Sequence, residues 1–347
     1  GGVTVWVIKR VGLPAAWYIN VGNGTFDQSR QVLASAEITN NDDIALSYTN
    51  GVWIVSLSDS KNYWMSVSSD ASVWRKISTT NPFLGARGIA WCPYSQSGSA
   101  STWVAGGNAT TFFTSSNGVT WSAGAAIDGT ATAPIVRCAK WCNGIIMLGG
   151  NGTVGGTIYP FLWWSTDGGA TLAGELQFTG APGQNILAID TDGQVTVVGL
   201  GVLIPGSLAN GATSAYYQGG SFGSATAFTP IATGAGGVPS AGSNVFPGRI
   251  DFQMYDVQYN GLTWLVCGVQ NTLVNGTTYD TVLTAPIAGL PTTWTPVITF
   301  TPPSAINTAG FSSADWNGQR WNLVPTTNFA AAANTYPFFT ADPTAAT

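Results

Sequence analysis

The sequence contains no histidine, and this absence removes several kinds of chemistry. Histidine is the commonest general base and metal ligand, so Ser-His-Asp and Cys-His catalysis are excluded. The four cysteines are Cys92, Cys138, Cys142 and Cys267, and the spacing of Cys138 and Cys142 without a histidine is poor for zinc. On a strand these two would share one face about 13 Å apart. We expect buried free thiols, with a disulfide as the alternative, and we predict no metal site and no cofactor.

Charged residues are also scarce, at 8% of the chain compared with roughly 25% in an ordinary soluble domain. The net charge is −5, and basic residues cluster only at 9–10 and 75–76, so nucleic acid is not an expected partner. No run reaches the roughly 18 apolar residues of a membrane-spanning helix, so membrane insertion is not expected either.

The polar surface must therefore come from Ser, Thr, Asn, Gln and the backbone. Such a composition is typical of secreted and virion proteins, and we expect a virion or extracellular surface location. The chain begins at Gly1 and shows no signal peptide, which fits a processed product or a portion of a longer protein.

Aromatic residues are abundant, at 12% of the chain including 15 tryptophans, and many recur in one repeated unit. The unit is a short apolar strand, an aromatic residue, an Asn-Gly turn and a second apolar strand. It occurs at 47–55, 140–149, 258–266 and 315–323, with Asp-Gly at 190–199 and a longer turn at 90–106. Asn-Gly and Asp-Gly supply the positive φ angles of a type I′ turn, which predicts a β-hairpin in each copy.

A second motif, with the pattern S-x-D-x-G-x-T-aromatic, follows several hairpins. The segment 165–172 supplies Ser165, Asp167, Gly169 and Thr171. The segment 114–121 keeps Gly118, Thr120 and Trp121 but has serine in place of the aspartate, and 68–74 keeps Asp70 and Trp74 but is one residue short. We expect the polar side chains to bond the backbone of a turn and the aromatic ring to pack between sheets.

Repeat units begin near Asp43, Arg87, Ile135, Asn185, Phe252 and Asn307, about 44 to 67 residues apart. This period predicts an all-β fold: a single β-propeller domain over 1–347 with about six four-stranded blades, seven being the alternative. Residues 43–347 form the successive blades, and 14–42 form an uncertain linker or partial blade, in which 31–37 is either a short helix or a remnant of a seventh blade. The strand within 1–13 should pair with the C-terminal strand and close the ring.

These motifs resemble the Asp-box repeats of bacterial neuraminidases (sialidases), and in particular the looser repeats of many bacteriophage tail and other surface proteins. The resemblance covers about residues 43–347. It implies that the Asp-boxes lie on the blade periphery as structural clips, and it says more about architecture than about activity.

A sialidase-like site has three arginines that hold a carboxylate, a tyrosine nucleophile activated by glutamate, and an aspartate acid/base. The matching residues would be Arg87, Arg137 and Arg249, near the starts of repeat units, with Glu37 or Glu175. The Arg-Ile-Pro signature of the family is absent, and 249–251 is the nearest approach. We favour the alternative in which these arginines bond backbone carbonyls at the blade entries, and we assign no catalytic residue.

Other glycosidases need two carboxylates that face each other. The candidate pairs are Asp42 with Asp43, Asp190 with Asp192, and Asp251 with Asp256. Each pair lies near a strand start or a hairpin turn, so we expect solvated turn aspartates.

The tryptophans Trp53, Trp103, Trp264 and Trp321 recur with the fold period and should pack between blades. Trp163–Trp164 and Tyr216–Tyr217 are adjacent pairs, so one ring of each is expected at the surface, where it would stack on a carbohydrate or contact another subunit. We predict a non-catalytic virion or tail-associated propeller that binds copies of itself, other virion or surface proteins, and host-surface glycans. The alternatives are a sialidase-like hydrolase and a structural subunit of an extracellular bacterial or archaeal surface assembly.

Overall fold

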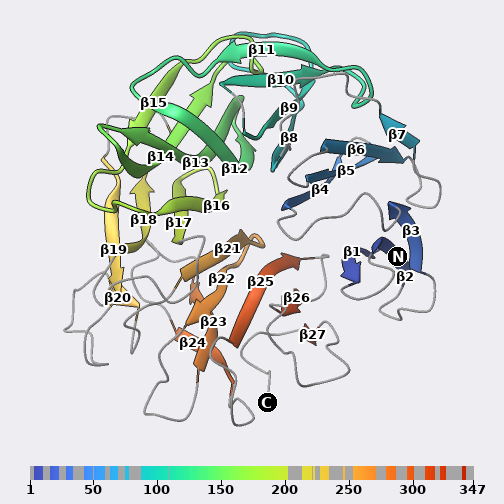
Figure 1. Ribbon diagram of the computed structural model, residues 1–347. Coiled ribbons are helices and arrows are strands. Elements are labelled where there is room, and N and C mark those ends of the chain that lie inside the picture. The colour runs from blue at the N-terminus through green and yellow to red at the C-terminus, as the bar shows by residue number, and fades with distance from the viewer. Residues whose placement is uncertain are drawn as a thin grey trace. The chain divides into compact units, whose positions relative to one another are not determined.

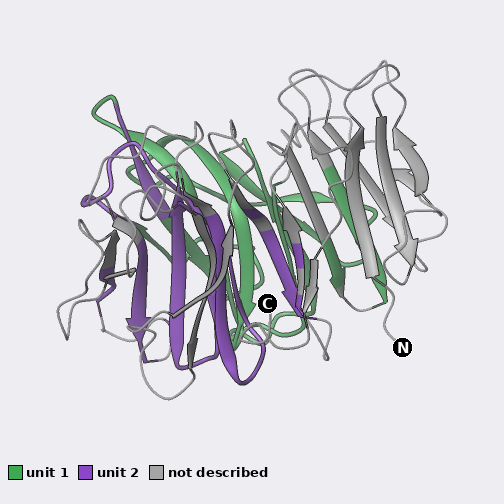
Figure 2. Cartoon of the chain, turned by 90° about the horizontal axis from the view of Figure 1, so that it is seen from below, with its two compact units in different colours: residues 1–156, 162–176 green, residues 157–161, 177–347 purple. Residues whose placement is uncertain are grey.

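The structure is a computed structural model in which every described element is a β-strand, so the predicted all-β class is confirmed (Figure 1). The described residues are 4–10, 16–22, 29–33, 43–49, 51–58, 63–68, 75–77, 87–108, 110–201, 213–220, 222, 227–233, 245–246, 253–270, 279–286, 295–300, 309–316, 321–325 and 338–340. The chain divides into two compact units (Figure 2): unit 1 holds residues 1–156 and 162–176, and unit 2 holds 157–161 and 177–347. The single domain over 1–347 stays a prediction.

Unit 1 contains one three-stranded sheet and a series of four-stranded sheets, in which strands that follow one another in sequence lie side by side. The three-stranded sheet consists of β1 (Thr4–Arg10), β2 (Ala16–Gly22) and β3 (Ser29–Leu33). The next sheet consists of β4 (Asp43–Thr49), β5 (Val52–Ser58), β6 (Tyr63–Ser68) and β7 (Arg75–Ile77). It is followed by β8 (Gly88–Cys92), β9 (Thr102–Gly106), β10 (Thr111–Ser115) and β11 (Ser122–Ala126). The last consists of β12 (Thr132–Cys142), β13 (Ile145–Val154), β14 (Thr157–Ser165) and β15 (Gly174–Gln177), and the division between the units runs through β14.

Unit 2 continues the same order. Its first sheet consists of β16 (Asn185–Thr191), β17 (Val195–Gly201), β18 (Thr213–Gly219) and β19 (Thr229–Thr233), with β20 (Val245–Phe246) added in parallel at the edge. Two further groups are β21 (Gln253–Tyr259), β22 (Thr263–Gln270), β23 (Tyr279–Pro286) and β24 (Thr295–Phe300), and β25 (Ala309–Trp316), β26 (Trp321–Pro325) and β27 (Phe338–Thr340). A short pairing of β22 with β25 joins these two groups.

The expectations for the ends of the chain are only partly tested. Residues 31–33 belong to β3, which pairs with β2, so this part of 31–37 is a strand, as the seventh-blade alternative expects, and not a helix. β1 pairs with β2 along its whole length and β27 pairs with β26, and the closure of the ring by the two ends stays a prediction.

The repeated unit forms the hairpin between the first two strands of a sheet. The aromatic residue before the turn lies opposite the tryptophan after it in four hairpins: Tyr48 and Trp53, Trp91 and Trp103, Tyr259 and Trp264, and Trp316 and Trp321. The centroids of the paired rings are 4.3 to 5.2 Å apart. Three of the tryptophans are at most 1% exposed, so the prediction that they pack inside the fold is confirmed for them.

The turns of these hairpins are of two kinds. At Asn143-Gly144 both φ angles are positive, 49° and 83°, as a type I′ turn requires. At Asp192 and Asn260 the turn is longer, and the side-chain Oδ1 accepts two backbone N–H groups at 2.6 to 2.9 Å. The type I′ prediction is wrong for these two, because side-chain capping replaces the left-handed first residue.

Neighbouring sheets bury their apolar faces against each other. In unit 1, Ile54 of β5 packs with Ile89, Trp103 and Phe113 of the next sheet. In unit 2, residues of β16, β17 and β18 pack with residues of β21 and β22 in the same way. A sheet of four short strands cannot bury its faces alone, so the sheets stabilise one another.

The turn between β14 and β15 is held by its own polar side chains. Ser165 Oγ donates to Asp167 Oδ1 at 2.8 Å and accepts the N–H of Gly169 at 2.8 Å. Asp167 also accepts the N–H and the hydroxyl of Thr171, at 2.9 and 2.6 Å. Burial disfavours the ionised carboxylate, but the hydrogen bonds outweigh it and lower the pKa of Asp167. The predicted side-chain bonds within this turn are therefore present.

The turn between β10 and β11 uses the same arrangement with one residue fewer. Asn117 Oδ1 accepts two backbone N–H groups, both at 2.8 Å, and Ser115 Oγ donates to it at 3.2 Å. Asn117 therefore takes the place of the aspartate, which the sequence pattern had assigned to Ser116. Trp121 packs against the cluster between the sheets, as predicted, and its indole donates to the carbonyl oxygen of Gly118 at 3.0 Å.

Both turns contact the preceding sheet of unit 1. The carbonyl oxygen of Gly169 accepts the N–H of Ala125 in β11 at 2.9 Å. Gly118, at a φ of 70°, lies so close to Ile54 of β5 that a Cβ atom would fall 2.9 Å from its Cδ1. Each turn thus ties its sheet to the one before it. The residues of the third copy, Asp70 and Trp74, lie outside the described residues.

Replacing Asp167 with alanine removes the acceptor of three hydrogen bonds. We expect a loss of about 1–3 kcal/mol in the free energy of unfolding, measured in urea at pH 7. Because the pKa of Asp167 is lowered in the folded state, this loss should shrink as the pH falls through that pKa. Asp167→Asn retains Oδ1 and should cost less; equal losses in the two variants would contradict the role given to the carboxylate.

Candidate functional site

The first strand of a sheet carries a bulge at a repeated position. Register shifts leave one residue unpaired in each of four first strands: Arg137 in β12, Leu187 in β16, Tyr255 in β21 and Ser312 in β25. Arg87 precedes β8 in the same arrangement, because its N–H bonds the carbonyl oxygen of Gly106, the partner of Gly88. The residue four positions after the bulge is Trp91, Trp141, Thr191, Tyr259 or Trp316. Equivalent positions in these first strands can therefore be identified by counting residues from the bulge.

Arg87 and Arg137, two members of the predicted triad, occupy this bulge position in consecutive first strands. Both side chains are half-buried, and the Nε of each is shielded from water. A guanidinium that grips a ligand carboxylate has to present its N–H groups to the ligand. The roles of these two arginines, as ligands of a carboxylate or as partners of backbone carbonyls, stay predictions. Arg249 lies outside the described residues.

A first strand at the edge of a sheet has alternate N–H groups that point away from the second strand. In unit 2, Asp190 accepts such groups from two strands. Its Oδ1 accepts the N–H of Thr191 at 2.8 Å, and its Oδ2 accepts the N–H of Tyr259 in β21 at 2.6 Å. One carboxylate thus joins the first strands of two neighbouring sheets.

Asp256 repeats this bridge one sheet further along. Its Oδ1 accepts the N–H of Val257, and its Oδ2 accepts the N–H of Ala314 in β25, both at 2.8 Å. The hydroxyl of Ser313 and the amide of Gln258 add bonds at 3.0 and 3.3 Å. Burial raises the pKa of Asp256 to about 6, against the effect of these hydrogen bonds and with a smaller contribution from the negative charge of Asp190.

These two aspartates contradict the expectation of solvated turn residues. Asp190 is 2% exposed and Asp256 is half-buried, and each carboxylate accepts backbone N–H groups of two neighbouring first strands. A buried carboxylate is favoured here because it satisfies backbone N–H groups that would otherwise be left without an acceptor. Asp192 caps its turn, as expected, while Asp42 and Asp251 lie outside the described residues.

Glu175, one of the two glutamates considered for a sialidase-like site, lies in β15, the fourth strand of its sheet. Its Oε1 accepts the N–H and the hydroxyl of Thr130 at 2.7 and 2.8 Å, and its Oε2 accepts the indole N–H of Trp163 at 3.3 Å. Glu175 therefore ties the loop before β12 to β14 and β15, and β15 is the edge of the sheet opposite its first strand, β12. Glu37 lies outside the described residues.

The aromatic pairs considered for glycan stacking are mostly inside the fold. Trp163 is 0% exposed, and Tyr216 and Tyr217 are each 7% exposed. The expectation of one exposed ring in each pair is therefore wrong for the tyrosines, because β21 and β22 cover Tyr217 and the ring of Phe178, from the loop after β15, packs on Tyr216. Trp164 is half-buried and lies over Gly174, where the ring leaves no space for a side chain.

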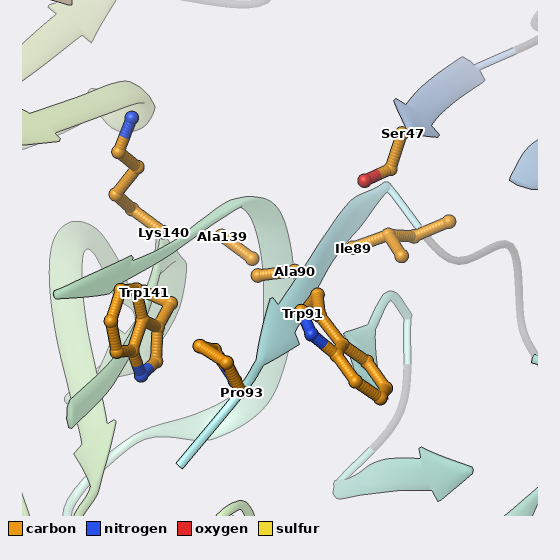
Figure 3. A pocket seen from close by; sticks show the side chains of 8 residues that line it. All are labelled: Ser47, Ile89, Ala90, Trp91, Pro93, Ala139, Lys140 and Trp141. Atoms are coloured by element: carbon orange, nitrogen blue, oxygen red, sulfur yellow. The ribbon is translucent and has the colours of Figure 1, made fainter. Parts of the chain in front are cut away.

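A pocket of about 370 Å³ lies along the first strands β4, β8 and β12 of unit 1. It is lined by Ser47, Ile89, Ala90, Trp91, Pro93, Ala139, Lys140 and Trp141. In Figure 3 the indoles of Trp91 and Trp141 lie on either side of Pro93, and Ser47 and Lys140 lie toward the opposite end. The pocket thus has an aromatic end and a polar end.

The two indoles of this pocket are fixed by neighbours. The ring of Trp91 packs against Trp103 with centroids 5.2 Å apart. The indole of Trp141 donates to the carbonyl oxygen of Tyr94 at 3.1 Å and meets the Tyr94 ring edge-on at 5.0 Å. Sequence analysis missed these two residues because it considered only the tryptophans after the turn of each hairpin. A comparison of the aromatic residues before the turn, across the repeats, would have identified them.

All four cysteines are free thiols, as predicted, although Cys138 and Cys142 are only half-buried. Burial raises the pKa of Cys267, and the nearby Asp256 adds to the shift. Among the described residues no group of three or more Cys, Asp or Glu side chains is placed to hold a metal ion. The same residues include no helix long and apolar enough to cross a membrane.

Asp256→Ala should lower the free energy of unfolding by about 2–5 kcal/mol, because buried backbone donors lose their acceptor. The folded-state pKa of about 6 lies above that of an unfolded aspartate, which is about 4, so the folded state binds this proton more tightly. The stability from the protonated carboxyl is full below pH 4 and is lost as the pH rises through about 6. The gap between wild type and variant in urea should therefore be larger at pH 4.5 than at pH 7.5. If the difference in free energy of unfolding between wild type and variant were larger at pH 7.5, the folded state would favour the ionised carboxylate, which would contradict the raised pKa.

Neither a protein-family model nor a curated protein matches this chain. Among solved structures it is similar to Sqt1 from Chaetomium thermophilum, with a TM-score of 0.50 and 13% identity over 92% of this chain and 76% of that one. YCF48 bound to D1 peptide gives a TM-score of 0.49 and 13% identity over 87% and 78% of the two chains, and Drosophila Semaphorin 2a gives 0.47 and 7% over 92% and 72%. At such identities the likeness concerns the fold alone. Together with the consecutive four-stranded sheets, it shows that this chain has a β-propeller fold.

Proposed function

We propose that this chain is a non-catalytic β-propeller of a virion, a phage tail or another extracellular surface, and that it binds a glycan. The observation that carries the proposal is the difference between the side chains found on the first strands of the two units. Carboxylates there accept backbone N–H groups, whereas the pocket on the neighbouring first strands is lined by aromatic and small side chains.

The carboxylates argue against glycoside hydrolysis. A glycosidase needs two carboxyl groups that face the substrate, one of them free to give or take a proton. Asp190 is buried, Asp256 is half-buried, and each has both oxygens engaged by donors. Glu175 is likewise engaged through both oxygens. These groups support the fold instead of reaching a substrate.

The pocket of unit 1 supports recognition. Half-buried indoles held by Trp103 and Tyr94 offer flat apolar faces, and such faces stack on the C–H groups of sugars. Ser47 and Lys140 supply polar contacts at the other end. A few polar groups in a mostly apolar lining are typical of small-molecule sites of this size.

The surface setting rests on composition and on the resemblance of the turns. Only 8% of the residues are charged, which suits a chain that packs against copies of itself or other surface proteins. The turns at 115–121 and 165–171 bond their backbone as Asp-box turns are expected to. Display of many copies would turn weak binding at one site into firm attachment.

A glycan array probed with the chain on a multivalent carrier tests this proposal. We expect binding to a defined set of glycans and no release of fluorophore from fluorogenic sialosides or other glycosides. Hydrolysis that is lost in Arg137→Ala would overturn the non-catalytic assignment. An array without any binding, together with self-assembly of the purified chain into rings or filaments, would instead identify a scaffold.

A further inference from the structure

The pocket of unit 1 is lined at the strand position where β16 carries a bridging carboxylate. Asp190 stands three residues after the bulge of β16 and directly before Thr191, the last residue of that strand. The residue directly before the aromatic residue ahead of the turn is Ala90 in β8, Ser47 in β4 and Lys140 in β12, and all three line the pocket. These strands therefore have a methyl group, a hydroxyl or a cation where β16 has a carboxylate.

The backbone donors that Asp190 serves have counterparts at Ala90. Asp190 accepts the N–H of Thr191, the residue that follows it, and the N–H of Tyr259. Tyr259 lies four residues after the bulge in β21, the first strand of the next sheet. The counterparts are the N–H groups of Trp91 and Trp141. The register supports this orientation, because the pairs of Trp91 with Trp103 and Trp141 with Ile146 are ones whose N–H groups point away from the second strand.

Ala90 cannot accept these N–H groups, since it ends in a methyl group. The volume that a carboxylate would fill is instead part of the pocket, with Ala139 beside it. Lys140 adds a positive charge to the lining. The N–H groups of Trp91 and Trp141 hold the strand positions of the two that meet at Asp190, and together with a cation such a pair suits an anion with two oxygens.

We propose, as a refinement of the glycan-binding function above, that this pocket binds the carboxylate of a hexuronate sugar through the N–H groups of Trp91 and Trp141 and the ammonium of Lys140. The carboxylate takes the place that the side chain of Asp190 holds in unit 2. The pyranose ring lies against the indoles at the aromatic end of the pocket (Figure 3). A simple inorganic anion would leave that end empty, which is why the ligand is a sugar acid.

Ala90→Asp tests this assignment, because it places a carboxylate of the chain itself where the ligand carboxylate binds. Titrations of sodium glucuronate and of neutral methyl glucoside are followed by tryptophan fluorescence and calorimetry. The wild type should bind glucuronate at least about tenfold more tightly than methyl glucoside. Ala90→Asp should weaken glucuronate binding by roughly tenfold or more and raise the melting temperature, as expected of a new bridge between β8 and β12.

The matched control is Ala126→Asp, which makes the same change at an exposed position of β11 in the same unit and should leave glucuronate binding unchanged. Lys140→Gln is a second variant in case Ala90→Asp fails to fold, and it should weaken glucuronate binding roughly three- to tenfold without affecting methyl glucoside. Equal binding of the two sugars by the wild type, or wild-type glucuronate binding in both pocket variants, would overturn the proposal.

The glycan array separates this inference from the proposed function. If the array finds ligands and their binding is unchanged in Ala90→Asp and Lys140→Gln, the pocket assignment is wrong and the glycan-binding function stands. If the array finds none but glucuronate binds the wild type and not Ala90→Asp, the carboxylate site stands and glycan recognition at a surface falls.

Discussion

The unpaired edge of each first strand is the constraint on which this structure depends. Such a strand is bonded on one side only, and each buried N–H group without an acceptor costs about 1–3 kcal/mol. In unit 2, four of these groups receive carboxylate oxygens at 2.6 to 2.8 Å from only two side chains. An aspartate suits this role because its two oxygens reach its own strand and the next one at the same time. The raised pKa of Asp256 is the electrostatic cost of that arrangement.

The bulge makes the repeated arrangement geometrically consistent. One extra residue in four of the first strands fixes which of the following residues face the neighbouring sheet. The aromatic pairs, with centroids 4.3 to 5.2 Å apart, lie at the same position of each hairpin, directly before and after the turn. Backbone register, and not the identity of any one side chain, sets the frame that the aspartates and the pocket share.

Repetition made the fold predictable from sequence, and singular residues made the site difficult to predict. Asn-Gly hairpins and tryptophans at a regular period marked the sheets, and Asp167 and Thr171 marked a bonded turn. The bridging role of Asp256 was missed because its partners, Ser313 and Ala314, are 57 and 58 residues away in sequence. Tyr216 and Tyr217 were expected to differ in exposure because alternation separates the two faces of a strand, but alternation does not reveal that a sheet covers one face and a loop residue the other.

The strand position held by Asp190 in β16 and by Ala90 in β8 thus differs in its role between two parts of one chain. Where it is aspartate, the carboxylate bonds two strands and is withdrawn from solvent; where it is alanine, the equivalent N–H groups border a pocket between indoles. If the proposed carboxylate site is correct, a change at this one position decides whether a first-strand edge contributes to stability or to binding. A fold-level likeness does not detect that difference, because both kinds of edge have the same backbone path. Function in this propeller therefore has to be sought where the repeat departs from its own stabilising pattern.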